Sequence, residues 1–168
     1  AHTGTIAIGD EALTALTSGT NNLAVGYQTM QNLTTGAANT ALGRKALNSA
    51  DGAENNNVAI GSSAMQNANN DSTENNVAVG VDAMSGATSG AVTRNVAVGA
   101  YAMDATGSIG GTDNVFLGSS AGGGSWATAT SNYNIGIGTN VMDAAMNGAT
   151  YNIGIGYVAL TDLTEGDY

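Results

Sequence analysis

The chain has 168 residues, a formal net charge of -10 from 13 acidic and 3 basic residues, and no cysteine. The negative charge disfavours binding to nucleic acid or to anionic membranes, and the lack of cysteine excludes disulfides and thiolate metal sites. With 25 glycines, no proline and no apolar run close to the ~20 residues of a membrane span, the composition favours many tight turns and no membrane insertion.

The first predicted element is the run 5–9, with sequence TIAIG, and its pattern returns along the whole chain, for example as NVAIG at 57–61. Aligned on the closing glycine, the units are centred on Gly9, Gly26, Gly43, Gly61, Gly80, Gly99, Gly118, Gly138 and Gly156. A period of 17 to 20 residues that tolerates small insertions is typical of a solenoid. The sequence therefore predicts one parallel β-solenoid over residues 1–168, with nine coils and no second domain.

A run of this kind has one aliphatic residue on each side of a small one, as in Val58, Ala59 and Ile60, with the polar Thr40 as a variant. Alternation along a strand puts the two aliphatic residues on one face, which we expect to be the core. The small residue is never polar in any unit, so the opposite face should be covered too, either by the same coil or by an identical chain. Because one thin coil buries little apolar surface, we expect a homo-oligomer, with three chains around one axis.

Asparagine precedes eight of the nine predicted strands, and Thr5 precedes the first. Asparagines at one position of successive coils predict a ladder in which each amide bonds its neighbour or caps a turn. The closing glycine, present in all nine units, indicates a positive φ or a close backbone approach at a corner.

An Ala-Met or Ala-Leu pair follows most of these glycines, as in Ala64 and Met65, and should point inward. Periodicity leaves open whether this short segment is a second strand or one helical turn. The polar residues that complete each unit vary in length and are predicted to be surface loops.

The seventh unit departs from the pattern, because Phe116 replaces the small residue and Gly122 replaces the Met or Leu. The phenyl ring could fill the space that the missing side chain leaves. The only tryptophan, Trp126, follows a glycine tract and precedes Tyr133, and the alternative is that these two residues form an exposed aromatic platform for a sugar or cell-surface polymer.

Residues for catalysis are scarce. His2 is the only histidine, so one chain offers no histidine relay or zinc cluster. Aspartates on different coils, such as Asp82 with Asp104 or Asp104 with Asp143, could form a carboxylate pair for glycoside hydrolysis, and the acidic loop 69–74 could hold calcium. Neither pattern is specific, so we assign no catalytic residues, no cofactor and no metal ligands.

The unit N-V-A-I-G-x-x-A-M, with an approach such as Thr35-Gly36-Ala37-Ala38-Asn39, resembles the head repeats of trimeric autotransporter adhesins and related repeats of phage tail fibres. The resemblance covers nearly all of the chain. It implies a β-roll or β-helix, left-handed in the adhesin heads, packed as a threefold trimer and used for attachment. The units here are longer than typical adhesin units, which favours the fibre repeats.

We therefore expect a non-enzymatic segment of a homotrimeric, extracellular fibre, most simply a phage tail fibre that binds a host glycan or protein receptor. The alternatives are the head of a bacterial surface adhesin and, from another class, a hexapeptide-repeat acyltransferase. That enzyme needs an aliphatic residue every six positions and an active-site histidine, whereas this chain has one aliphatic cluster per coil and only His2. Because neither end resembles a capping unit, we expect a piece of a longer chain.

Overall fold

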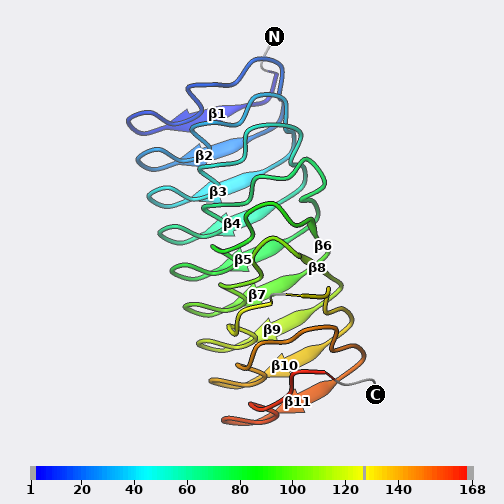
Figure 1. The fold of residues 1–168 in the computed structure, drawn as a ribbon. Coiled ribbons are helices and arrows are strands. Elements are labelled where there is room, and N and C mark those ends of the chain that lie inside the picture. Colours follow the sequence, from blue (N-terminus) through cyan, green and yellow to red (C-terminus); the bar gives the residue numbers. More distant parts are fainter. Residues whose placement is uncertain (1–2, 127, 166–168) are drawn as a thin grey trace.

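A computed structural model describes residues 3–126 and 128–165 as a stack of coils, with β1 and β11 at opposite ends (Figure 1). One long sheet runs along the stack. Its strands are β1 (Ile6–Ile8), β2 (Leu23–Val25), β3 (Thr40–Leu42), β4 (Val58–Ile60), β5 (Val77–Val79), β7 (Val96–Val98), β9 (Val115–Leu117), β10 (Ile135–Ile137) and β11 (Ile153–Ile155). A two-stranded sheet pairs β6 (Val92–Thr93) with β8 (Gly111–Thr112).

Every strand of the long sheet pairs in parallel with the strand of the next coil. The register advances by one repeat each time, from Ile6 to Leu23 at one end and from Ile135 to Ile153 at the other. The predicted parallel β-solenoid is confirmed, as nine rungs joined by eight turns, and the described residues contain no helix.

The core runs up the middle of the stack and is built from the small strand residues and the Met or Leu residues after the corners. Ala59 and Met65 are both fully buried. The packing is also close at Gly154, where an added methyl group would lie 3.0 Å from Val141 Cγ2 and 3.1 Å from Met142 Cε. The predicted cover over the small residues is confirmed from the second coil onward, and the same chain provides it. Ala7, in the outermost coil, is exposed.

The prediction that the aliphatic strand residues form the core is wrong for the single chain. Val58 and Ile60 are partly exposed, while Ala59 between them is fully buried. The physical reason is the narrow cross-section of one coil. The methionine of the opposite wall reaches so near the sheet that only alanine or glycine fits the inward position, with Phe116 as the one exception.

The corner glycines have φ values between 129° and 143°, as the sequence predicted. An added Cβ at Gly61 would lie 2.3 Å from the carbonyl oxygen of Gly80, so the coils stack too closely here for any side chain. The segment after each glycine is neither a strand nor a helical turn. It is a turn with left-handed residues at alternate positions, such as Ser63 (φ 59°) and Met65 (φ 52°).

The asparagine ladder is confirmed. Asn95 shows the arrangement: its backbone N–H and its Nδ2 both donate to Asn76 Oδ1, at 2.9 Å and 3.2 Å, and its Nδ2 also donates to the carbonyl of Gly111 at 2.8 Å. Asn114 then donates to Asn95 Oδ1 in the same way. The amides are buried, so the ladder satisfies backbone groups that water cannot reach.

In the seventh coil the predicted volume exchange is confirmed. A methyl group added at Gly122 would lie 2.8 Å from the ring of Phe116, and one added at Gly136 would lie 2.6 Å from it. The phenyl ring therefore occupies the space over both glycines. Trp126 packs edge-on against this ring, with centroids 6.3 Å apart.

Candidate functional site

The largest exposed apolar surface of the single chain is the outer face of the long sheet. We call it the aliphatic strip and define it as the first and third residues of the nine strands of that sheet. All of these residues are aliphatic except Thr40. Ile6 at one end is 54% exposed and Ile155 at the other end is 69% exposed.

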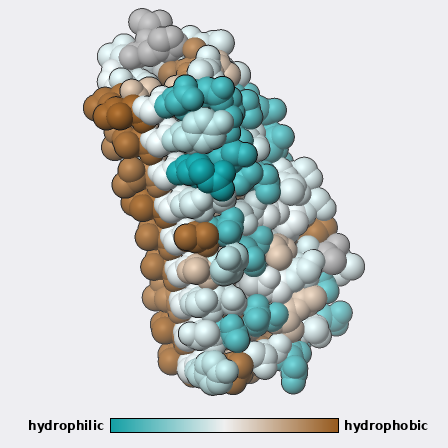
Figure 2. All heavy atoms as spheres, turned by 90° about the vertical axis from the view of Figure 1, so that its left-hand side faces the viewer, coloured by the Kyte–Doolittle hydropathy of each residue, from teal (hydrophilic) through white to brown (hydrophobic). Residues whose placement is uncertain are grey.

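The strip is continuous over the full height of the stack. Figure 2 shows it as a brown column along the left edge of the molecule, beside a pale column and, beyond that, scattered hydrophilic groups in teal. Eight steps of ~4.8 Å and a width of ~7 to 10 Å give an area of roughly 270 to 380 Å². That is as large as the largest apolar patch of a typical monomer, and such patches mark interaction sites.

Exposed apolar residues directly after the corner glycines lie next to the strip along the chain. They are Tyr27, Val81 and Tyr157. No charged side chain belongs to the strip itself. The surface is therefore suited to apolar contact, and the hydroxyl of Thr40 is the one polar side-chain group in the strip.

The two residues predicted to form an aromatic platform do not form it together. Trp126 is 1% exposed and belongs to the core, so the expected exposure of this residue is wrong. Its contact with Phe116 accounts for this burial, because the seventh coil lacks a methionine. Tyr133 is 47% exposed, and its ring stacks on Tyr151 with centroids 5.0 Å apart. A ligand-binding role for Tyr133 stays a prediction.

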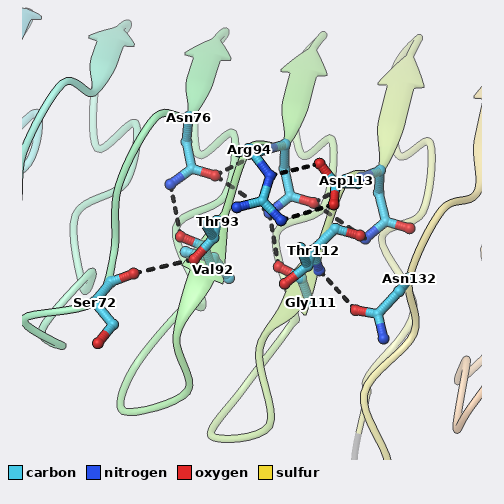
Figure 3. Close-up of polar contacts among 11 residues, drawn as sticks. Ser72, Asn76, Val92, Thr93, Arg94, Gly111, Thr112, Asp113 and Asn132 are labelled. Carbon is cyan, nitrogen blue, oxygen red and sulfur yellow. Dashed lines mark hydrogen bonds and ion pairs between the residues drawn. The ribbon is translucent and has the colours of Figure 1, made fainter.

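A second column of exposed side chains consists of the residues just before the ladder asparagines. In it, the guanidinium of Arg94 holds Asp113 of the next coil through two bonds, of 2.8 Å and 2.9 Å (Figure 3). Next to this pair, Asn132 Oδ1 accepts a bond from the backbone N–H of Thr112 at 2.8 Å. These contacts of Arg94 and Asn132 join neighbouring coils, so their role in holding the stack together is sufficient to explain them.

The proposed carboxylate pair is formed in part. Asp104 and Asp143 lie two coils apart on either side of Gly123. A methyl group added at Gly123 would lie 3.1 Å from Asp104 Oδ1 and 3.0 Å from Asp143 Oδ1. Burial raises the pKa of Asp104, and the charges of Asp143 and Asp82 raise it further. Burial also raises the pKa of Asp143.

The raised pKa of Asp104 predicts a pH-dependent stability. A carboxylate whose pKa is higher in the folded state than its ordinary value of 3.8 destabilises the fold once it is ionised. The free energy of unfolding should therefore fall as the pH rises through the folded pKa of Asp104, where the carboxyl group ionises. Asp104→Asn should raise the melting temperature at about pH 7 by no more than a few degrees, because solvent screens this half-buried group. The gain should vanish at about pH 3, below both pKa values.

Asp113→Asn is the control with the opposite sign. The hydrogen bond from Arg94 lowers the pKa of Asp113, so this carboxylate contributes stability above its ordinary pKa. Its removal should not raise the melting temperature at neutral pH. Equal melting curves for Asp104→Asn and the wild type at pH 7 would contradict the assignment.

The described residues enclose no pocket that could hold a small substrate, around the carboxylate pair or elsewhere. His2, on which the acyltransferase alternative depends, lies outside the described residues. No helix in the described part of the chain is long and apolar enough to cross a membrane. Comparisons with protein-family models, with curated proteins and with solved structures find no match to this chain.

Proposed function

We propose that this chain is a non-enzymatic, rod-forming segment of a homotrimeric fibre that attaches to a host surface. The observation that carries the proposal is the aliphatic strip, which runs the full height of the stack without a charged residue. Apolar surface of this size on one face favours association with an identical face, because every rung then meets a rung of equal spacing.

A threefold arrangement fits the shape of the coil better than a pair. A stable interface buries about 800 Å² per partner, which is more than the strip provides alone. Around a threefold axis each chain meets two neighbours, so the corner residues Tyr27, Val81 and Tyr157 at the edge of the strip are covered as well. The sequence resemblance to adhesin heads and tail-fibre repeats implies the same symmetry and a left-handed coil.

The decisive measurement is the mass in solution. Sedimentation equilibrium should give three times the chain mass of 16.5 kDa, independent of concentration over the micromolar range. A mass of two chains would contradict the trimer but keep the strip as an interface. A monomer at all concentrations would contradict the fibre proposal as a whole.

The adhesive part of the proposal is tested separately. Binding of the trimer to an array of bacterial and animal glycans should be weakened by Tyr133→Ala or Tyr151→Ala, since these stacked rings form an exposed aromatic surface. The acidic, glycine-rich surface gives no reason to expect binding to nucleic acid. Undiminished glycan binding by both variants would remove these rings from the site. The same proposal covers a virion fibre and a bacterial surface adhesin, and the fibre is favoured by the length of the repeat.

A further inference from the structure

Three carboxylates from two neighbouring coils meet at one place on the loop side of the stack. They belong to Asp51, Glu54 and Asp71, and each offers an oxygen within 4.8 Å of the others. Asp51 and Asp71 are exposed, whereas Glu54 is fully buried. Two ligands on opposite sides of a calcium ion lie about 4.6 to 5.2 Å apart, since each Ca–O distance is about 2.3 to 2.6 Å. The cluster therefore has the dimensions of a calcium site.

The burial of Glu54 is an independent sign of a missing partner. Its Oε2 accepts a hydrogen bond of 3.1 Å from the backbone N–H of Gly52. Its Oε1 is buried and has no hydrogen-bond partner. A buried carboxylate oxygen without a partner is costly, and a bound cation is one of the few groups that can satisfy it.

Glu54 is also unusual in its own column of the solenoid. Its carbonyl accepts a bond from the ladder asparagine of the preceding coil, Asn39, at 2.7 Å. The residues that accept the equivalent bond in other coils are Gly36, Thr73, Val92, Gly111, Ser131 and Ala149. All of these are neutral. Thr73 is the equivalent residue of the next coil, and its hydroxyl oxygen, Oγ1, is likewise buried without a hydrogen-bond partner.

The position of Asp71 brings its carboxylate over the backbone of the preceding coil. Asp71 Oδ1 accepts a bond of 3.0 Å from the N–H of Ala53. A side chain at Gly52 would collide with this oxygen, so the glycine is what allows the close approach. Arg94 bonds Asp113, and neither Arg44 nor Lys45 forms an ion pair in the described structure, so no basic side chain there neutralises the three acids.

We propose that Asp51, Glu54 and Asp71 bind a calcium ion that joins the loops of two successive coils. The ligands are all hard oxygens, which suits Ca²⁺, and water would complete the coordination. Magnesium demands a shorter and stricter octahedron, so it should compete weakly. Burial raises the pKa of Glu54, and the charges of Asp71 and Asp51 add to this effect. A divalent cation bound among the three carboxylates would instead lower the pKa of Glu54, because its positive charge favours the ionised form.

The test is calorimetric titration of the 168-residue chain with CaCl₂, together with its melting temperature in chelator and in calcium. We expect one calcium ion per chain with a Kd on the order of 10⁻⁴ to 10⁻³ M, as in extracellular calcium modules, and a higher melting temperature at about 5 mM calcium. Equal concentrations of magnesium should give a much smaller shift. Terbium luminescence provides a direct readout of ion binding.

Glu54→Gln, Asp51→Asn and Asp71→Asn should each weaken calcium binding by at least about tenfold, given that even outer-shell partners of a metal cost 10 to 100-fold. Asp10→Asn removes one exposed carboxylate elsewhere and should leave the affinity unchanged. The proposal is overturned if the wild type binds no calcium up to roughly 10 mM, or if the three variants bind as tightly as the wild type.

A neutral, protonated Glu54 is the competing explanation. In that case the melting temperature of the wild type would not respond to calcium, and Glu54→Gln would match the wild type near neutral pH. This site does not depend on the proposed trimer. Measuring the mass in the same samples separates the two questions, since calcium binding can fail while the trimer persists.

Discussion

Val98→Asp combined with Ile137→Asp should convert the proposed trimer into monomers that remain folded. Both side chains belong to the aliphatic strip and are exposed on the single chain. In a threefold assembly the two substitutions would place six unpaired carboxylates against apolar surface. Each buried ion costs several kcal/mol, so the penalty exceeds what a narrow interface can supply. Sedimentation should then show the mass of one chain.

The folded state of this double variant is checked by circular dichroism and by thermal melting at a concentration where the wild type is dissociated. Since the substituted side chains do not enter the coil interior, the monomer should keep its spectrum. Thr88→Asp combined with Ser89→Asp adds the same charge at exposed loop positions and should remain trimeric. A double strip variant that still sediments as three chains would show that the interface lies elsewhere.

Asn95→Ala, in the middle of the ladder, should produce a large loss of stability. It removes the donor to the Gly111 carbonyl and the acceptor of the Asn114 N–H. Both backbone groups are then left buried without a partner, at about 1 to 3 kcal/mol each. We expect a loss of roughly 2 to 6 kcal/mol, which corresponds to a fall in melting temperature of about 4 to 24 °C for a chain of this size.

Asn67→Ala is the matched control, because Asn67 is exposed and stands outside the ladder. Its effect should stay within about 0.5 kcal/mol, as for most surface substitutions. Chemical denaturation of both variants, measured in the same buffer, compares them directly. If Asn95→Ala were as mild as the control, water or relaxed geometry would have to satisfy the two backbone groups.

The repeat, the strand positions and the ladder could be predicted from the sequence because they depend on spacing. Residues 57–61 and their counterparts fix the register, and a glycine such as Gly61 fixes the corner. Which face of each strand is buried could not be predicted in the same way. Alternation shows that Val58 and Ile60 share one side, but only the width of the coil decides which side is inward.

The candidate sites were harder to predict because they depend on contacts between coils. The burial of Trp126 follows from its contact with Phe116, and a glycine tract beside an aromatic residue is equally compatible with an exposed loop. The sequence pointed to the acidic loop that contains Asp71. It did not pair this residue with Asp51 and Glu54, because loop lengths vary and hide which residues stack. The signal available in the sequence was Glu54 itself, an acidic residue at a repeat position that is neutral in the other coils.

Because each strand of the long sheet described here pairs only with the strands of the coils directly before and after it, inserting or deleting one complete unit should leave all other rungs unchanged. Such an event would alter the rod by one step of ~4.8 Å and the strip by two side chains. The length of the rod and the area of its apolar strip would then change together, so natural variation in the number of units would adjust the length of the proposed fibre and leave its other coils unaltered.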